Sequence, residues 1–229
     1  MESKYMIFAF DERPSDSPFI ETIWRTQSER PGTFISRAVS HWEMVVTKQN
    51  GRITVCVRGP ETKATLAHCP EHAEFFGIQF KLGTFMPQLP TGNLLDGDIT
   101  LPEATTRSFW LLGSAWQLPD YENAETFVNR LVRDSLLVRE PVVGAALQGQ
   151  LKELSLRSIQ RRFLRATGLT QGAVRQIERA REAEALLEQG VSILDTVDQT
   201  GYADQSHMTR SLKHLIGRTP AQIIGTRTN

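Results

Sequence analysis

The sequence predicts an α+β protein of more than one domain, with a β-rich N-terminal part followed by an all-helical C-terminal part. Up to about residue 105, short apolar runs alternate with glycine and proline turns, a pattern typical of a barrel or a sandwich. Beyond that point glycines become rarer and apolar residues recur at helical spacing. The absence of a glycine-rich phosphate loop and of regular strand–helix alternation argues against a nucleotide-binding α/β fold.

The N-terminal strands are predicted from apolar runs that end at turn residues. Trp42–Thr47 and Ile53–Val57 flank Gln49–Gly51, a sequence that favours a hairpin turn. Phe75–Leu82 is another such run and is closed by Gly83. We therefore expect several short antiparallel strands in this part of the chain.

The change from strand to helix spacing sets the predicted domain boundaries. Glu122–Arg139 carries apolar residues among charges at helical spacing and should form an amphipathic helix that ends before Pro141. We expect a β-rich effector-binding or dimerisation domain over residues 1–118, a connecting helix within 119–140 and a helical domain over 141–229.

The formal net charge is zero, but the charges are unevenly distributed. Residues 1–129 carry 11 lysines and arginines against 16 aspartates and glutamates, whereas residues 130–229 carry 15 against 10. A basic half joined to an acidic half indicates a nucleic-acid partner.

The sequence has two cysteines, no secretory signal and no long apolar run. These features predict a cytoplasmic protein without disulfides or a membrane span.

A short helix over Leu156–Ala166 is predicted between an N-cap at Ser155 and a stop at Gly168. Arg157 and Arg161 lie opposite its apolar side when residues are placed at helical spacing. In a major groove such a face could bridge phosphates and bind guanine edges. Helical periodicity alone leaves the other interpretation open, namely a solvated helix face.

The same pattern recurs near the C-terminus. Ser192 and Asp195 have the spacing of a capping box and should start a short helix. Gly201 permits a tight turn after it, and Asp204 caps a second helix over Gln205–Ile216. Helix, glycine turn and second helix are typical of a helix-turn-helix unit. The polar front of the second helix holds Ser206, Arg210 and Lys213, with His207 and His214 beside them.

Ser155–Gly168 and Gly201–Pro220 resemble the AraC/XylS family of transcriptional regulators. The second segment is the more specific, with Gly-aromatic-x-Asp-Gln-Ser at its start and Gly-x-Thr-Pro at its end. The resemblance covers about residues 150–224 and implies two helix-turn-helix units joined by a long helix that enter successive major grooves. Gln171–Gln189 fits that helix, because at about 1.5 Å per residue it spans roughly 28 Å, close to the roughly 34 Å of one DNA turn.

The resemblance also implies roles for individual residues. Base contacts would come from Arg157, Gln160 and Arg161 in the first unit and from Gln205, Ser206, His207 and Arg210 in the second. Phosphate contacts are expected from Thr170, Lys213, Arg218 and Thr219. One departure concerns Gln148 and Gly149, which stand where the family has Leu and Ala, and it predicts a looser or shifted supporting helix in the first unit.

The N-terminal half resembles the sensor domains of some of these regulators. The similar segments are Pro18–Trp24, Arg58–Thr62 and Phe76–Gly83, and they imply a cupin-like β-barrel that binds an effector or mediates dimerisation. Trp24 and Trp42 are the candidate effector-pocket residues, since aromatic pocket walls are common, although structural packing is the alternative for each.

Catalysis and metal binding are not expected. Cys56 with the His68–His72 segment lacks the spacing of a zinc finger, and two cysteines cannot build the four-cysteine site with which some family members repair DNA. No motif combines a nucleophile with a base.

We expect a sequence-specific regulator of transcription without a cofactor. Its partners would be double-stranded DNA, an unknown small-molecule effector, a second copy of the chain and, for an activator, RNA polymerase. The alternative is an effector-binding or protein-interaction module with weakened DNA reading.

Overall fold

A six-stranded antiparallel sheet forms the centre of the N-terminal part in the computed structural model, which describes residues 10–150 and 154–225. Its strands follow the order β1-β2-β7-β4-β5-β9. The predicted hairpin is the β4–β5 pair, and the β-rich fold is confirmed. In the described part of the chain β1 and β9 form the two edges, so the sheet is open rather than closed into the expected barrel. The strands are Asp11–Pro14 (β1), Ile20–Ser28 (β2), Glu43–Gln49 (β4), Arg52–Arg58 (β5), Ala73–Phe80 (β7) and Asp98–Leu101 (β9).

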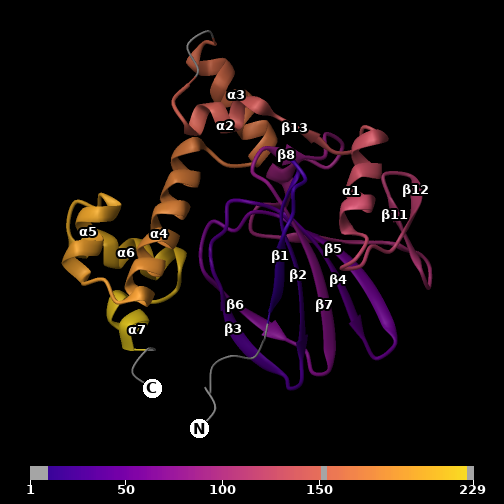
Figure 1. Ribbon diagram of the computed structural model, residues 1–229, viewed down its shortest axis with the longest axis horizontal. Coiled ribbons are helices and arrows are strands. Elements are labelled where there is room, and N and C mark those ends of the chain that lie inside the picture. The colour runs from indigo at the N-terminus through magenta and orange to yellow at the C-terminus, as the bar shows by residue number, and fades with distance from the viewer. Residues whose placement is uncertain (1–9, 151–153, 226–229) are drawn as a thin grey trace.

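Smaller sheets flank the central one (Figure 1). β3 pairs with β6 to form a two-stranded ribbon, β8 pairs with β13, and β10, β11 and β12 form a meander on the side of the first helix. A 3₁₀ helix precedes β9. These elements are Gly32–Ser36 (β3), Thr65–Cys69 (β6), Thr84–Phe85 (β8), Thr91–Leu94 (η1), Glu103–Thr105 (β10), Ser108–Leu111 (β11), Ser114–Gln117 (β12) and Val138–Arg139 (β13).

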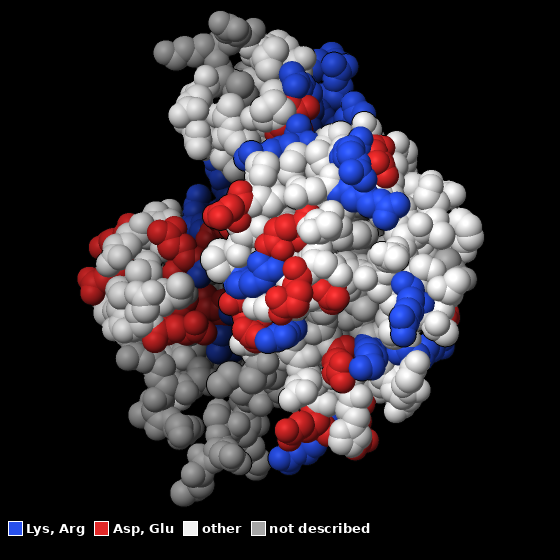
Figure 2. All heavy atoms as spheres, turned by 45° about the vertical axis from the view of Figure 1, so that its right-hand side comes forward, with Lys and Arg blue, Asp and Glu red and all other residues white. Residues whose placement is uncertain are grey.

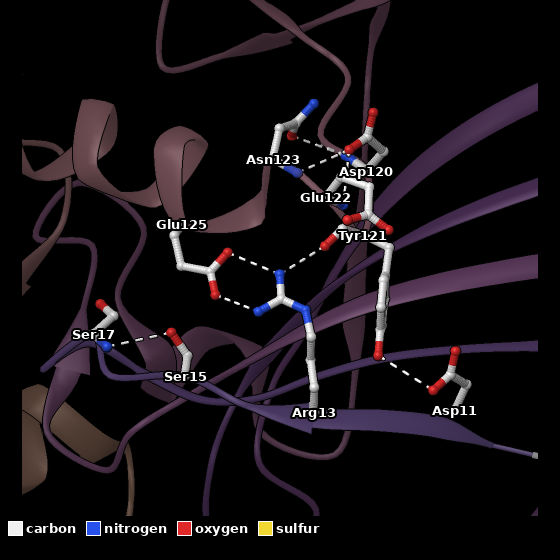
Figure 3. A network of polar contacts seen from close by, with 9 residues as sticks. All are labelled: Asp11, Arg13, Ser15, Ser17, Asp120, Tyr121, Glu122, Asn123 and Glu125. Carbon is white, nitrogen blue, oxygen red and sulfur yellow. Dashed lines mark hydrogen bonds and ion pairs between the residues drawn. The ribbon is translucent and has the colours of Figure 1, made fainter.

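Helix α1, Ala124–Arg133, packs against the central sheet. Phe127 and Leu131 are buried in the same core cluster as the sheet residues. Arg13 on β1 donates to both carboxylate oxygens of Glu125, at 2.5 and 2.9 Å, and to the carbonyl oxygen of Tyr121 (Figure 3). Hydrogen bonding to Arg13 lowers the pKa of Glu125 to about 2. This contact fastens α1 to the edge strand of the sheet.

The expected helix over 122–139 is shorter than its periodicity predicts. Ser135 adopts a positive φ of 57°, and the amides of Leu136 and Leu137 both donate to the carbonyl of Leu131, which closes the helix. The chain then forms β13, whose pairing with β8 replaces further helical bonds. Pro141 begins the next helix instead of ending this one, in agreement with the preference of proline for the first helical position.

Six helices follow in the described part of the chain, and the predicted all-helical C-terminal part is confirmed. The three predicted N-caps, Ser155, Ser192 and Asp204, each accept a backbone hydrogen bond from the residue three positions later, and Thr170 does the same at the start of α4. No helix among residues 10–150 and 154–225 has both the length and the apolar character to cross a membrane. The helices are Pro141–Leu147 (α2), Leu156–Thr167 (α3), Gln171–Gln189 (α4), Ile193–Thr200 (α5), Gln205–Leu215 (α6) and Pro220–Gly225 (α7).

The two parts of the molecule share one of its two hydrophobic cores. One core lies between the central sheet, the β10–β12 meander and α1. The other joins all six C-terminal helices and also includes Ala38 and Phe85 from the β-rich part. The helical domain therefore does not complete its core without the domain that precedes it.

Candidate nucleic-acid interface

Helix α3 presents a row of polar side chains opposite its buried side. Ile159 and Phe163 are buried, whereas Arg157, Gln160 and Arg161 are exposed. None of these three side chains has a hydrogen-bond or ion-pair partner among the residues that the structure describes. They are available to a ligand, as the sequence predicts.

The support of α3 comes from the short helix α2. Glu140 caps α2 by accepting from the amide of Val142, and the same carboxylate receives two hydrogen bonds from Arg162 on α3, at 3.0 and 2.7 Å. Helix α2 ends at Leu147, and Gly149 has a positive φ of 69°. The unusual Gln148–Gly149 pair thus follows the helix instead of lying within it, which the sequence alone does not reveal.

Helix α6 likewise has a buried side and an exposed polar face. Met208, Leu212 and Leu215 are buried, and Asp204 fixes the start of the helix by accepting from the amide of His207 at 2.7 Å. The four side chains expected to read bases in this unit, Gln205, Ser206, His207 and Arg210, are all exposed.

The turn before α6 is held by Tyr202. Its hydroxyl lies 2.9 Å from the hydroxyl of Ser211, and the ring of His207 stands edge-on to its ring at 5.2 Å between centroids. His207 is thus oriented by a buried aromatic residue while its own side chain remains exposed.

The four expected phosphate contacts are placed differently from one another. Lys213 is exposed on α6. The hydroxyl of Thr170 caps α4 by accepting from Ala173, and the hydroxyl of Thr219 lies 3.2 Å from Gln222. Arg218 forms ion pairs with Glu184 and Glu188 on α4, at 2.5 and 3.0 Å. The last three therefore already have structural partners within the chain.

Glu184 joins the two domains, a role that cannot be predicted from helical spacing. Its side chain is 3% exposed and accepts from Arg218 and from Arg37, the latter at 2.7 Å. Although burial lowers the pKa of Arg218, hydrogen bonds and charge from Glu184 raise it above its usual value. Arg37 is 147 positions away from Glu184 in the chain. Because helical spacing relates only neighbouring residues, the sequence shows Glu184 simply as an acidic residue on a long helix.

The β3–β6 ribbon contacts the end of α6. The amide of Ala38, just after β3, donates to the carbonyl of Leu215 at 2.7 Å, and that of Ala64, just before β6, donates to the carbonyl of His214 at 2.8 Å. Carbonyls at a helix C-terminus have no partner within the helix. Here the β-rich domain supplies their partners, so it fixes one end of α6.

The two units differ in charge. Helix α3 carries four arginines and no acidic residue, whereas α5, α6 and the turn between them carry three aspartates against Arg210 and Lys213. Figure 2 shows basic side chains gathered at the end of the molecule where Figure 1 places α2 and α3, and acidic side chains on the lobe of α5 to α7. The first unit therefore has the stronger electrostatic attraction for a polyanion.

A cavity of about 510 Å³ lies between the central sheet and the β3–β6 ribbon. Trp24 lines it and donates to Glu43 at 3.1 Å. A Cβ at Gly77 would lie 2.1 Å from the Trp24 ring, so the indole can lie across β7 only because this residue is glycine. Burial raises the pKa of Glu43. Other lining residues are Phe34, Cys56, Arg58, His68, Phe75 and, from α4, Arg181.

Trp42, the other residue expected at an effector pocket, does not line this cavity. It is 5% exposed, stacks on Phe80 with ring centroids 4.0 Å apart, and donates to the carbonyl of Thr84 at 2.6 Å. Its position is that of a core residue.

Cys56 lines the cavity. Burial, together with hydrogen bonding to Asp98, raises the pKa of its thiol to about 12, so the thiol remains protonated at neutral pH.

Comparison with known proteins supports the C-terminal interpretation. Residues 152–225 match the family described as "Helix-turn-helix domain", which is of the AraC type. Curated proteins give no significant sequence match. A crystal structure of ToxT from Vibrio cholerae O395 is 9% identical, with a TM-score of 0.42, and covers 96% of this chain and 98% of its own. A second one, bound to (E)-4-(8-methylnaphthalen-1-yl)but-3-enoic acid, is 10% identical, with a TM-score of 0.42, and covers 95% and 99%. Residues 152–225, about a third of the chain, thus match the AraC-type helix-turn-helix family.

Proposed function

We propose that this protein is a sequence-specific transcriptional regulator that inserts α3 and α6 into successive major grooves of DNA. The observation that carries the proposal is a pair of capped helices, at opposite ends of a 19-residue helix, each with an exposed polar front. Helix α4 would set the distance between the two reading faces. Its length of roughly 28 Å is comparable with one turn of B-DNA.

The base contacts are proposed on the side chains that the structure leaves exposed. The side chains of Arg157 and Arg161 suit guanine, and those of Gln160 and Gln205 suit adenine. The hydroxyl of Ser206 can hydrogen-bond with either base. Since Arg218 is held by two glutamates, we assign it to positioning of the second unit and leave phosphate contacts chiefly to the exposed Lys213.

The cavity beside the β3–β6 ribbon is the proposed effector site. Its aromatic walls are typical of small-molecule sites, and charged side chains, among them Glu43 and Arg58, also line it. The ribbon that closes the cavity also holds the end of α6. An effector there would contact the element that positions the second reading helix. A mass-spectrometric search for small molecules that co-purify with the full chain, repeated with Trp24→Ala, tests this assignment. Loss of a bound compound in the variant is expected.

The DNA function is tested with the full chain, because the helical domain shares its core with the β-rich part. Binding sites selected from random DNA should show two protected major-groove segments about 10 base pairs apart, and log affinity should fall steeply with log salt. Arg210→Ala should cost about 1–3 kcal/mol and relax preference at one base. An equal loss on all sequences would place Arg210 on a phosphate.

A second candidate function has one observation in its favour. The second unit carries three aspartates around its reading helix, which would repel phosphates. The chain would then be an effector-binding or protein-interaction module with weakened DNA reading. Absence of DNA binding at low salt would favour this alternative over the first proposal.

A further inference from the structure

The two reading helices differ in a way that the charged residues do not explain. Helix α3 exposes two leucines, Leu156 at 78% and Leu164 at 50%, whereas no large apolar side chain of α6 is exposed in the described structure. Exposed leucines are common singly on protein surfaces. Leu164 is unusual because it lies among side chains whose polar character suits DNA.

Leu164 shares a face with the proposed guanine-reading arginines. At 100° per residue it lies about 20° around the helix from Arg157 and about 60° from Arg161. Its rise from Arg157 is about 10 Å along the axis, which corresponds to about three base pairs at 3.4 Å each. Neither hydrophobic core includes Leu164, unlike its neighbour Phe163. It therefore has no packing role that accounts for a leucine at this position.

We propose that Leu164 is a specificity-determining residue that contacts the C5-methyl group of a thymine in the half-site entered by α3. This inference rests on the proposed DNA-binding function. In the major groove the thymine methyl is the only apolar group at a base edge, and apolar side chains recognise it by contact. The half-site of α3 would then combine a guanine bound by arginine with a thymine about three base pairs away, while that of α6 would have no methyl-dependent position.

Uracil substitution tests the contact directly. Uracil lacks the methyl group of thymine and keeps its hydrogen-bonding groups. A site selected by the full chain is resynthesised with each thymine replaced in turn. Wild-type protein should lose affinity about fourfold at one thymine in the α3 half-site, the factor expected for burial of one methyl group. Leu164→Ala should bind the thymine site more weakly and lose this sensitivity, whereas Leu164→Met should keep it.

A matched control is Leu66→Ala, which removes a leucine that is 66% exposed on β6 and should leave the uracil penalty unchanged. The proposal is overturned if wild type tolerates uracil throughout the α3 half-site, or if Leu164→Ala retains the full penalty. A variant that loses transcriptional activation while keeping the penalty would show that Leu164 contacts a protein instead. If the full chain selects no site at low salt, the proposed DNA function fails and this inference fails with it.

Discussion

Replacing Glu184 by glutamine should weaken the junction of the two domains. The carboxylate is 3% exposed and pairs with Arg37 and Arg218. Removing one partner of a buried ion pair costs about 3–5 kcal/mol. Arg37 is 52% and Arg218 is 26% exposed, so water screens part of the loss. We therefore expect Glu184→Gln to lower the free energy of unfolding by about 2–3 kcal/mol.

Urea denaturation followed by circular dichroism at 222 nm measures this effect on the helices, and tryptophan fluorescence follows the β-rich part in parallel. The matched control is Glu188→Gln, whose side chain is 47% exposed and pairs with Arg218 at 3.0 Å. This control should lose at most about 1 kcal/mol. Equal losses in the two variants, or a loss below about 0.5 kcal/mol for Glu184→Gln, would refute the role of Glu184 as a buried junction.

Three further outcomes are expected. Gly217→Ala should destabilise the chain by about 1–2 kcal/mol in thermal unfolding, because the φ of Gly217 is 81° and a Cβ there would lie 2.7 Å from Ile35. The control Gly172→Ala, whose Cβ would meet only the Thr170 hydroxyl at 3.9 Å, should be neutral or stabilising. Glu140→Gln should remove footprinting protection from the α3 half-site before the α6 half-site, because it weakens the bond to Arg162, and simultaneous loss of both would argue against this. Burial and the charge of a nearby arginine lower the pKa of His41 to about 3. Since the unfolded chain takes up this proton below pH 6.5 and the folded chain does not, stability should fall as pH drops from 6.5 to 5, with a smaller slope in His41→Gln.

The parts of the fold that depend on local interactions could be predicted from the sequence. Ser155, Ser192 and Asp204 cap their helices as predicted, because an N-cap needs only a side-chain oxygen and an amide three residues on. The exposed reading faces of α3 and α6 also follow from helical spacing alone.

Features that depend on distant partners could not be predicted. Leu137 and Val138 continue the helical periodicity of α1, yet the pairing of Val138 with Phe85 draws this segment into a strand. The two tryptophans look alike in sequence, but Trp24 faces a cavity and Trp42 a core, because they lie on strands with different neighbours. The ion pair of Arg218 with Glu184 also joins residues that lie far apart in the sequence.

The hydrogen bonds from Ala38 and Ala64 to the end of α6 make these two amides natural probes of motion between the domains. Each amide exchanges its proton with solvent only when its bond to α6 opens. Their exchange rates therefore measure how often the β-rich domain releases the second reading helix. A compound that binds between the sheet and the ribbon would slow or accelerate both protons together, without any DNA in the sample.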